Sequence, residues 1–178
     1  MRLLSAGIDR IDKTLFCNVD NPDYRNKPSH GGLWASTFDR QRKTSSWLEW
    51  VKDANYHLDR YGHCISFKLK KSAKVYYLNT VSDYTNLLDV YGYDYKPFHE
   101  TPSQKSIDFV KLSEDYDALY IGEELIFDYE LRYASLSSGI NGFYCYDVDT
   151  WLIFNLECIN MGSVMNHNFN LDCRYNDI

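Results

Sequence analysis

Hydrophobic and polar positions alternate along the chain with two different periods. Continuous or alternating apolar runs predict strands over residues 14–19, 33–36, 63–69, 73–78, 117–121, 125–129 and 143–155. Apolar residues spaced three and four positions apart predict helices over residues 46–61, 80–91 and 106–113. The pattern therefore predicts an α+β fold with about three helices, in which strands outnumber helices.

Start and stop signals refine this pattern. Ser46 and Glu49 form a predicted capping box, and Trp47 and Trp50 are expected on the core-facing side of that helix. The short polar segment 70–72 predicts a hairpin between strands 63–69 and 73–78. We expect one domain over residues 1–178, with a core over about 14–160 and an Asn-rich C-terminal arm over 161–178.

The stretch from Lys27 to Ser36 combines turn formers, a base and a cation with the start of an aromatic strand. Gly31 and Gly32 permit positive φ or close approach to a ligand, and Trp34 opens the strand that follows. One interpretation is a small-molecule pocket in which Lys27, His30 or Ser36 contacts the ligand. The other interpretation is an ordinary loop that enters a core strand.

Composition limits the possible functions. The 178 residues carry a net charge of −6, which argues against sequence-independent binding of nucleic acid over a broad face. Nucleic acid remains possible through a local basic patch, either residues 40–43 or residues 68–71. The five cysteines are scattered, which favours reduced thiols over a disulfide framework or a metal site. With no membrane-spanning run and no signal-peptide core, the expected location is the cytoplasm.

Several reaction classes have no support in the sequence. Signatures of a nucleophile elbow, a P-loop, a dinucleotide-binding glycine motif and an H-E-x-x-H zinc site are missing. A cysteine hydrolase that pairs Cys17 or Cys145 with His30 stays open, although neither cysteine has a flanking signature.

The order of these features resembles the ADP-ribosyltransferase-like fold, represented among small bacterial and phage proteins. The resemblance rests on the segments 27–36, 46–50, 107–109, 115–118, 146–150 and 154–155. It implies a mainly antiparallel, split β-sheet that holds the nicotinamide end of NAD. It also implies an intracellular NAD-dependent transferase or NAD-glycohydrolase-like activity, with a role as a toxin, phage factor or host-conflict component.

The resemblance also assigns roles to residues. Lys27, Gly31, Gly32, Trp34 and Ser36 would form the cofactor-binding segment. His30 or Arg25 would serve the phosphate or ribose, although neither lies on the predicted first strand 14–19, where the family has its Arg or His. Asp149 would take the place of the late-strand glutamate, because a carboxylate stabilises the positive charge that develops as nicotinamide departs. Alternatively, Asp147 and Asp149 form the solvent-facing side of an exposed strand.

The target of such an enzyme would be an unknown protein or nucleic acid. The competing hypothesis is a non-catalytic phage or bacterial inhibitor that binds its partner through an acidic, tyrosine-rich surface. The chain has 16 tyrosines, and tyrosine offers both a large apolar body and a polar tip to a partner.

Overall fold

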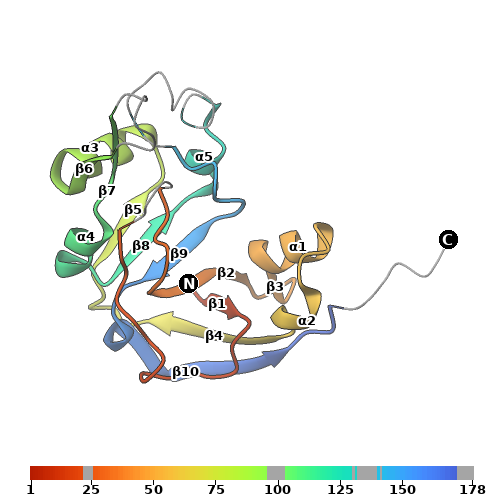
Figure 1. Ribbon diagram of the computed structural model, residues 1–178. Coiled ribbons are helices and arrows are strands. Elements are labelled where there is room, and N and C mark those ends of the chain that lie inside the picture. The colour runs from red at the N-terminus through yellow and green to blue at the C-terminus, as the bar shows by residue number, and fades with distance from the viewer. Residues whose placement is uncertain (22–25, 96–102, 130, 132–139, 141, 172–178) are drawn as a thin grey trace.

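The computed structural model describes residues 1–21, 26–95, 103–129, 131, 140 and 142–171 (Figure 1). Its first elements are β1 (Leu3–Ala6), β2 (Leu33–Asp39), β3 (Thr44–Ser45), α1 (Ser46–Asp53), α2 (Leu58–Tyr61), β4 (His63–Leu69), β5 (Val75–Leu78) and α3 (Val81–Tyr91). They are followed by β6 (Gly92–Tyr95), β7 (Gln104–Ile107), α4 (Phe109–Asp115), β8 (Ala118–Ile121), α5 (Glu123–Ile126), β9 (Thr150–Ile153), a 3₁₀ turn (Leu156–Cys158) and β10 (Ile159–Asn168).

The main sheet has the strand order β10-β4-β1-β2-β9-β8-β5, with β3 attached to β2. Among the described strands, β5 and β8 pair in parallel, and the other named pairs are antiparallel. The described part of the chain is thus an α+β domain with a mixed, mostly antiparallel sheet. It has five α-helices rather than the three expected, and none of them is long and apolar enough to span a membrane.

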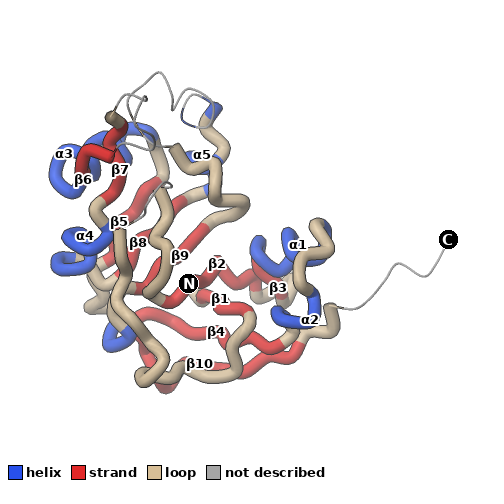
Figure 2. The backbone as a smooth tube through the Cα atoms, viewed as in Figure 1, coloured by secondary structure: helices blue, strands red, loops and turns tan. Residues whose placement is uncertain are grey.

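The sheet divides into two halves that share β2. The first part of β2, Leu33–Ala35, pairs with β9, whereas Ser36 and Thr37 pair with β1. Because the two neighbours of β2 pair with different parts of it, β1 and β9 diverge (Figure 2). Helix α1 lies beside β2 because the two-residue strand β3 turns the chain back and leads directly into it.

Three groups of buried side chains hold these elements together. One packs α3, α4 and α5 against β5 and β8, a second lies against β1, β4 and β9, and a third joins α1 to β1 and β4. Helix α3 starts with a complete capping box from Thr80 and Asp83, which satisfies free N–H groups of its first turn. The expected helix over 80–91 and the strands beginning near 33, 63, 73 and 117 are confirmed.

The predicted first strand, residues 14–19, is wrong. The carboxylate of Asp12 accepts hydrogen bonds from the N–H (2.9 Å) and hydroxyl (2.6 Å) of Thr14, which holds residues 13–15 in a turn, and the described residues 16–19 form no strand. Leu15 is exposed as a result. The true first strand is β1, and the charge of the preceding Arg2 obscures its apolar pattern.

The predicted hairpin over 63–78 is also wrong. Both strands exist, but β4 pairs with β1 and β10, while β5 lies at the opposite edge of the sheet beside β8. Instead of pairing locally, each strand takes a partner from a distant part of the chain. Alternation of apolar and polar residues predicts a strand but does not identify the strand with which it pairs.

Several predicted boundaries change in the second half of the chain. Residues 123–126 form helix α5 where a strand over 125–129 was expected, and the helix expected over 106–113 begins only at Phe109, after strand β7. The long strand expected over 143–155 is reduced to β9. The expected C-terminal arm contains most of β10, a ten-residue strand paired with β4.

Candidate functional site

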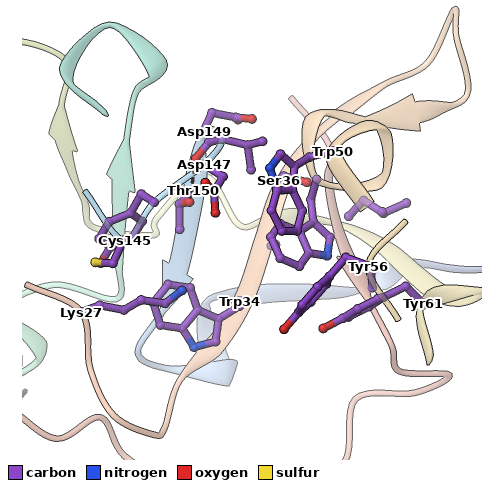
Figure 3. A pocket seen from close by; sticks show the side chains of 16 residues that line it. Lys27, Trp34, Ser36, Trp50, Tyr56, Tyr61, Cys145, Asp147, Asp149 and Thr150 are labelled. Atoms are coloured by element: carbon purple, nitrogen blue, oxygen red, sulfur yellow. Dashed lines mark hydrogen bonds between the residues drawn. The ribbon is translucent and has the colours of Figure 1, made fainter. Parts of the chain in front are cut away.

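A cavity of about 480 Å³ lies beside the divergence of the sheet. It is enclosed by β1 and β2, by α1 and the segment leading to α2, by Lys27, and by the loop that precedes β9 (Figure 3). Its position follows from the strand pairing, because β9 leaves β2 after Ala35 while β2 continues beside β1.

Four aromatic rings from α1 and the segment after it form one wall of the cavity. Trp47 stacks on Trp50 with ring centroids 5.0 Å apart, and the rings of Tyr56 and Tyr61 stack at 6.1 Å. Trp47 also meets Tyr61 edge-on at 5.7 Å. This wall offers flat apolar faces together with indole N–H and phenol O–H groups.

A break in the predicted helix 46–61 produces this wall. Asn55 and His57 adopt left-handed φ values of 50° and 44°, which end α1 at Asp53 and turn the chain into the short α2. The turn returns Tyr56 and Tyr61 toward α1.

The start of that helix differs from the prediction as well. Ser45 is the N-cap, and its hydroxyl accepts from the N–H of Leu48 at 3.4 Å. Ser46 instead donates its hydroxyl to the carboxylate of Asp149, and Glu49 forms an ion pair with Arg42. The loop before β9 is therefore bonded directly to the first residue of α1.

The opposite side of the cavity contains a cation held over two aromatic rings. The ammonium nitrogen of Lys27 lies 5.0 Å from the ring centroid of Trp34 and 5.4 Å from that of Tyr146. Figure 3 shows the Lys27 side chain extending over Trp34. These distances are typical of cation–π attraction, so this side of the cavity has aromatic faces suited to a positively charged planar group.

Two buried hydroxyl groups around the cavity lack partners. Ser36 Oγ and Tyr146 Oη form no hydrogen bond with any described residue, and each residue is 2% exposed. Burial raises the pKa of Tyr146 well above its ordinary value, so its phenol stays protonated. Buried polar groups are rarely left unsatisfied in folded proteins, which makes the Ser36 hydroxyl a candidate contact for a ligand.

The two acids of the loop before β9 have different surroundings. Asp149 is 7% exposed, and its carboxylate accepts from the N–H of Thr37 at 3.1 Å as well as from the Ser46 hydroxyl. Asp147 is exposed and lines the same cavity. Asp149 thus joins two elements whose residues are 112 and 103 positions away, whereas Asp147 presents its carboxylate to solvent at the cavity.

The residues selected from the sequence fall into two groups in space. Lys27, Trp34, Ser36 and Asp149 all line the cavity. His30 does not line it, because its side chain is 68% exposed and its Nδ1 lies 3.0 Å from a carboxylate oxygen of Asp20. Arg25 lies outside the described residues.

The two glycines of the same stretch are required by packing within the protein. Gly31 and Gly32 have φ values of +86° and +67°. A Cβ on Gly31 would lie 2.1 Å from the carbonyl oxygen of Asn18, and a Cβ on Gly32 would lie 2.5 Å from Cδ1 of Leu152. The two glycines therefore allow close packing against the chain's own backbone and against β9, rather than against a ligand. This packing sets the start of β2, which carries Trp34 and Ser36 to the cavity.

Sequence reasoning missed much of the aromatic wall. Trp47 and Trp50 were expected in the core, and both pack against the third core group, but they are half-buried and also line the cavity. Leu48 and Val51 are the fully buried residues of α1. The sequence did contain a signal of this wall. Apolar residues cover more of the helix surface than one core-facing side needs, and further aromatic residues follow at positions 56 and 61.

Among the described residues, no group of three or more His, Cys, Asp or Glu side chains could hold a metal ion. Comparison with protein-family models, with curated proteins and with solved structures finds no match to this chain. The geometry of the cavity is therefore the basis for a functional hypothesis.

Proposed function

We propose that the chain binds the nicotinamide end of NAD in this aromatic cavity and acts as an ADP-ribosyltransferase-like or NAD-glycohydrolase-like protein. The proposal includes an ADP-ribosyltransferase-like arrangement of the divided sheet. The observation that carries it is the meeting of Trp34 and Ser36 on β2 with the acidic loop 147–149 around one cavity.

The residues around the cavity fit this ligand chemically. A nicotinamide ring attached to ribose is planar and positively charged, and aromatic faces with nearby carboxylates attract such a group. Lys27 already lies over Trp34 and Tyr146 at cation–π distances. A ligand cation would displace the Lys27 ammonium from these faces, leaving it free to meet a ligand phosphate. The unpartnered hydroxyl of Ser36 offers a hydrogen bond to a carboxamide.

Asp147 and Asp149 would have different roles in catalysis. NAD supplies an activated glycosidic bond, whose cleavage develops positive charge on the ribose carbon. The exposed carboxylate of Asp147 would stabilise that charge. Asp149 would hold the loop against β2 and α1 through Thr37 and Ser46. This assignment moves the charge-stabilising role from Asp149, as the resemblance implies, to its neighbour.

Tryptophan fluorescence provides the binding test. The chain has four tryptophans, and Trp34, Trp47 and Trp50 line the cavity, so bound nicotinamide should quench their emission. A Trp34→Leu variant should bind NAD at least about tenfold more weakly, as expected when an aromatic contact to a cation is lost. No quenching and no thermal stabilisation by millimolar NAD would overturn the proposal.

Nicotinamide release and transfer of labelled ADP-ribose to lysate components provide the activity test. Asp147→Asn should reduce both by about a hundredfold, the effect of removing one electrostatic contact to a transition state, while NAD binding changes little. Asp94→Asn, on the exposed face of β6, is the matched control and should leave both unchanged. Binding without release or transfer would reject the enzyme and favour a non-catalytic binding protein.

A further inference from the structure

A second site lies where three strands bring basic residues together. A hollow of about 450 Å³ is lined by Arg2, Phe38, Arg40, Lys43, Ser66 and His167 among others, and we call it the basic hollow. A neighbouring hollow of about 390 Å³ shares Arg2, Phe38 and Arg40 and extends the basic surface to Lys68. Neither hollow shares a lining residue with the aromatic cavity.

The basic hollow joins two basic segments that are separate in the sequence. Residues 40–43 form the turn between β2 and β3, and Lys68 lies on β4. In the sheet, β1 lies between β2 and β4, so Arg2, immediately before β1, comes between the two segments.

Arg2 is the buried anchor of the hollow. It is 9% exposed, and its Nη1 donates to the carbonyl (3.2 Å) and hydroxyl (2.9 Å) oxygens of Ser66 and to the carbonyl oxygen of Ser163 (2.8 Å). Across the described residues, nothing accepts a hydrogen bond from its Nε or Nη2. The guanidinium is therefore fixed in position, with two of its nitrogens available to a ligand.

No carboxylate neutralises these cations in the described part of the chain. The ion pairs there involve Arg10, Lys13, His30 and Arg42, but none of the cations of the two hollows. Asp39, which lines the neighbouring hollow, accepts from the backbone N–H groups of residues 41 and 42 and forms no ion pair with a described cation.

Burial and, after it, neighbouring positive charge lower the pKa values of two groups in the hollow. Burial and then the charge of Arg40 lower the pKa of Arg2. Burial and then Arg2 lower the pKa of His167, whose Nε2 lies 2.7 Å from Ser66 Oγ. The positive charges of Arg2 and Arg40 thus act on each other, and a bound anion would offset their repulsion.

We propose that the basic hollow binds the phosphate group of a nucleotide or of a single-stranded nucleic acid. An arginine with a free pair of donors matches the oxygens of phosphate, and the neighbouring Arg40, Lys43 and Lys68 supply further charge. The site is independent of the proposed NAD cavity, because the two share no residue.

The test uses fluorescence anisotropy of a fluorescein-labelled oligothymidylate, with AMP and inorganic pyrophosphate as competitors. The test variant combines Arg40→Gln with Lys43→Asn, because Lys43 has a φ of 52° that asparagine tolerates. The control combines Lys74→Asn with Lys105→Gln, two exposed lysines of other elements that remove the same charge. We expect the test variant to bind roughly tenfold or more weakly and the control to bind as the wild type does.

The competitors distinguish the two sources of phosphate. Displacement by AMP or pyrophosphate at similar concentrations supports a free phosphate ester as ligand. If the oligonucleotide binds but neither competitor displaces it, and if its affinity depends less on salt in the test variant than in the wild type, the ligand is a nucleic-acid strand. The proposal fails if none of the three probes binds, or if the control variant loses as much affinity as the test variant. NAD quenching at the aromatic cavity should be unaffected by either variant.

Discussion

Replacing Ser36 with alanine should stabilise the ligand-free protein. The hydroxyl is buried without a partner among the described residues, and an unsatisfied buried polar group costs about 1–3 kcal/mol. Removing one oxygen beside an existing cavity adds little new empty volume. We therefore expect the free energy of unfolding to rise by about 1–2 kcal/mol, equivalent to an increase in Tm of about 2–8 °C for a chain of this size.

Ser66→Ala is the matched control, since it makes the same substitution at another buried serine on a strand. Its hydroxyl accepts from Arg2 at 2.9 Å and lies 2.7 Å from Nε2 of His167. Loss of a hydrogen bond to a charged partner should lower the free energy of unfolding by about 2 kcal/mol. The same substitution is thus expected to raise the free energy of unfolding at position 36 and to lower it at position 66.

Urea denaturation followed by far-UV circular dichroism measures both effects, and equal m-values would show that the unfolded states are comparable. A loss of stability in Ser36→Ala as large as that in Ser66→Ala would refute the reasoning, because the Ser36 hydroxyl would then have a partner in the ligand-free protein. With NAD present, the proposed contact predicts a smaller ligand-induced rise in Tm for Ser36→Ala than for the wild type.

Three further substitutions test the fold. Gly31→Ala should lower the free energy of unfolding by more than about 2 kcal/mol, because the new Cβ would lie 2.1 Å from the carbonyl oxygen of Asn18. Urea denaturation measures this loss, and a loss below about 1 kcal/mol would contradict the close packing. Thr80→Ala removes the N-cap of α3 and should cost about 1 kcal/mol, whereas unchanged stability would show that the cap contributes nothing. His167 has a lowered pKa when folded, so the unfolded chain takes up its proton more readily, and stability should fall as pH drops below about 6.5. His167→Gln should reduce that fall, and identical pH profiles would exclude His167 as a contributor.

Local signals predicted those elements that neighbouring residues specify by themselves. Helix α3 has its apolar stripe, its capping box and a terminal glycine within one short segment, and it was predicted almost to the residue. Residues 14–19 are also apolar and β-prone, but the carboxylate of Asp12 holds residues 13–15 in a turn and the rest of the segment is a loop. Val19 is buried in the core and the carbonyl of Cys17 accepts from the N–H of Gly32, but no described strand pairs along the segment. Strand propensity fails there because it reports packing on a pleated surface and does not supply a partner strand.

The candidate site could be predicted only in part. Trp34 and Ser36 were selected because they follow glycines in a stretch that resembles a cofactor-binding segment, and both line the cavity. The stacked Trp47 and Trp50 were assigned to the core, because helical spacing does not reveal where a helix breaks and leaves a side uncovered. Asp147 and Asp149 could not be separated by sequence, since their different exposure depends on hydrogen bonds to β2 and α1.

The sequence by itself determined the class of fold, most of the strand and helix segments, the turn before β2 and the acidic charge of the chain. Tertiary structure alone decided which strands pair, because a strand's alternation specifies its buried face but not its neighbour. It also decided that β1 and β9 diverge along β2, which opens the aromatic cavity, and that β1 brings two distant basic segments together at Arg2. Both candidate sites depend on contacts between residues far apart in the chain, which no local pattern records.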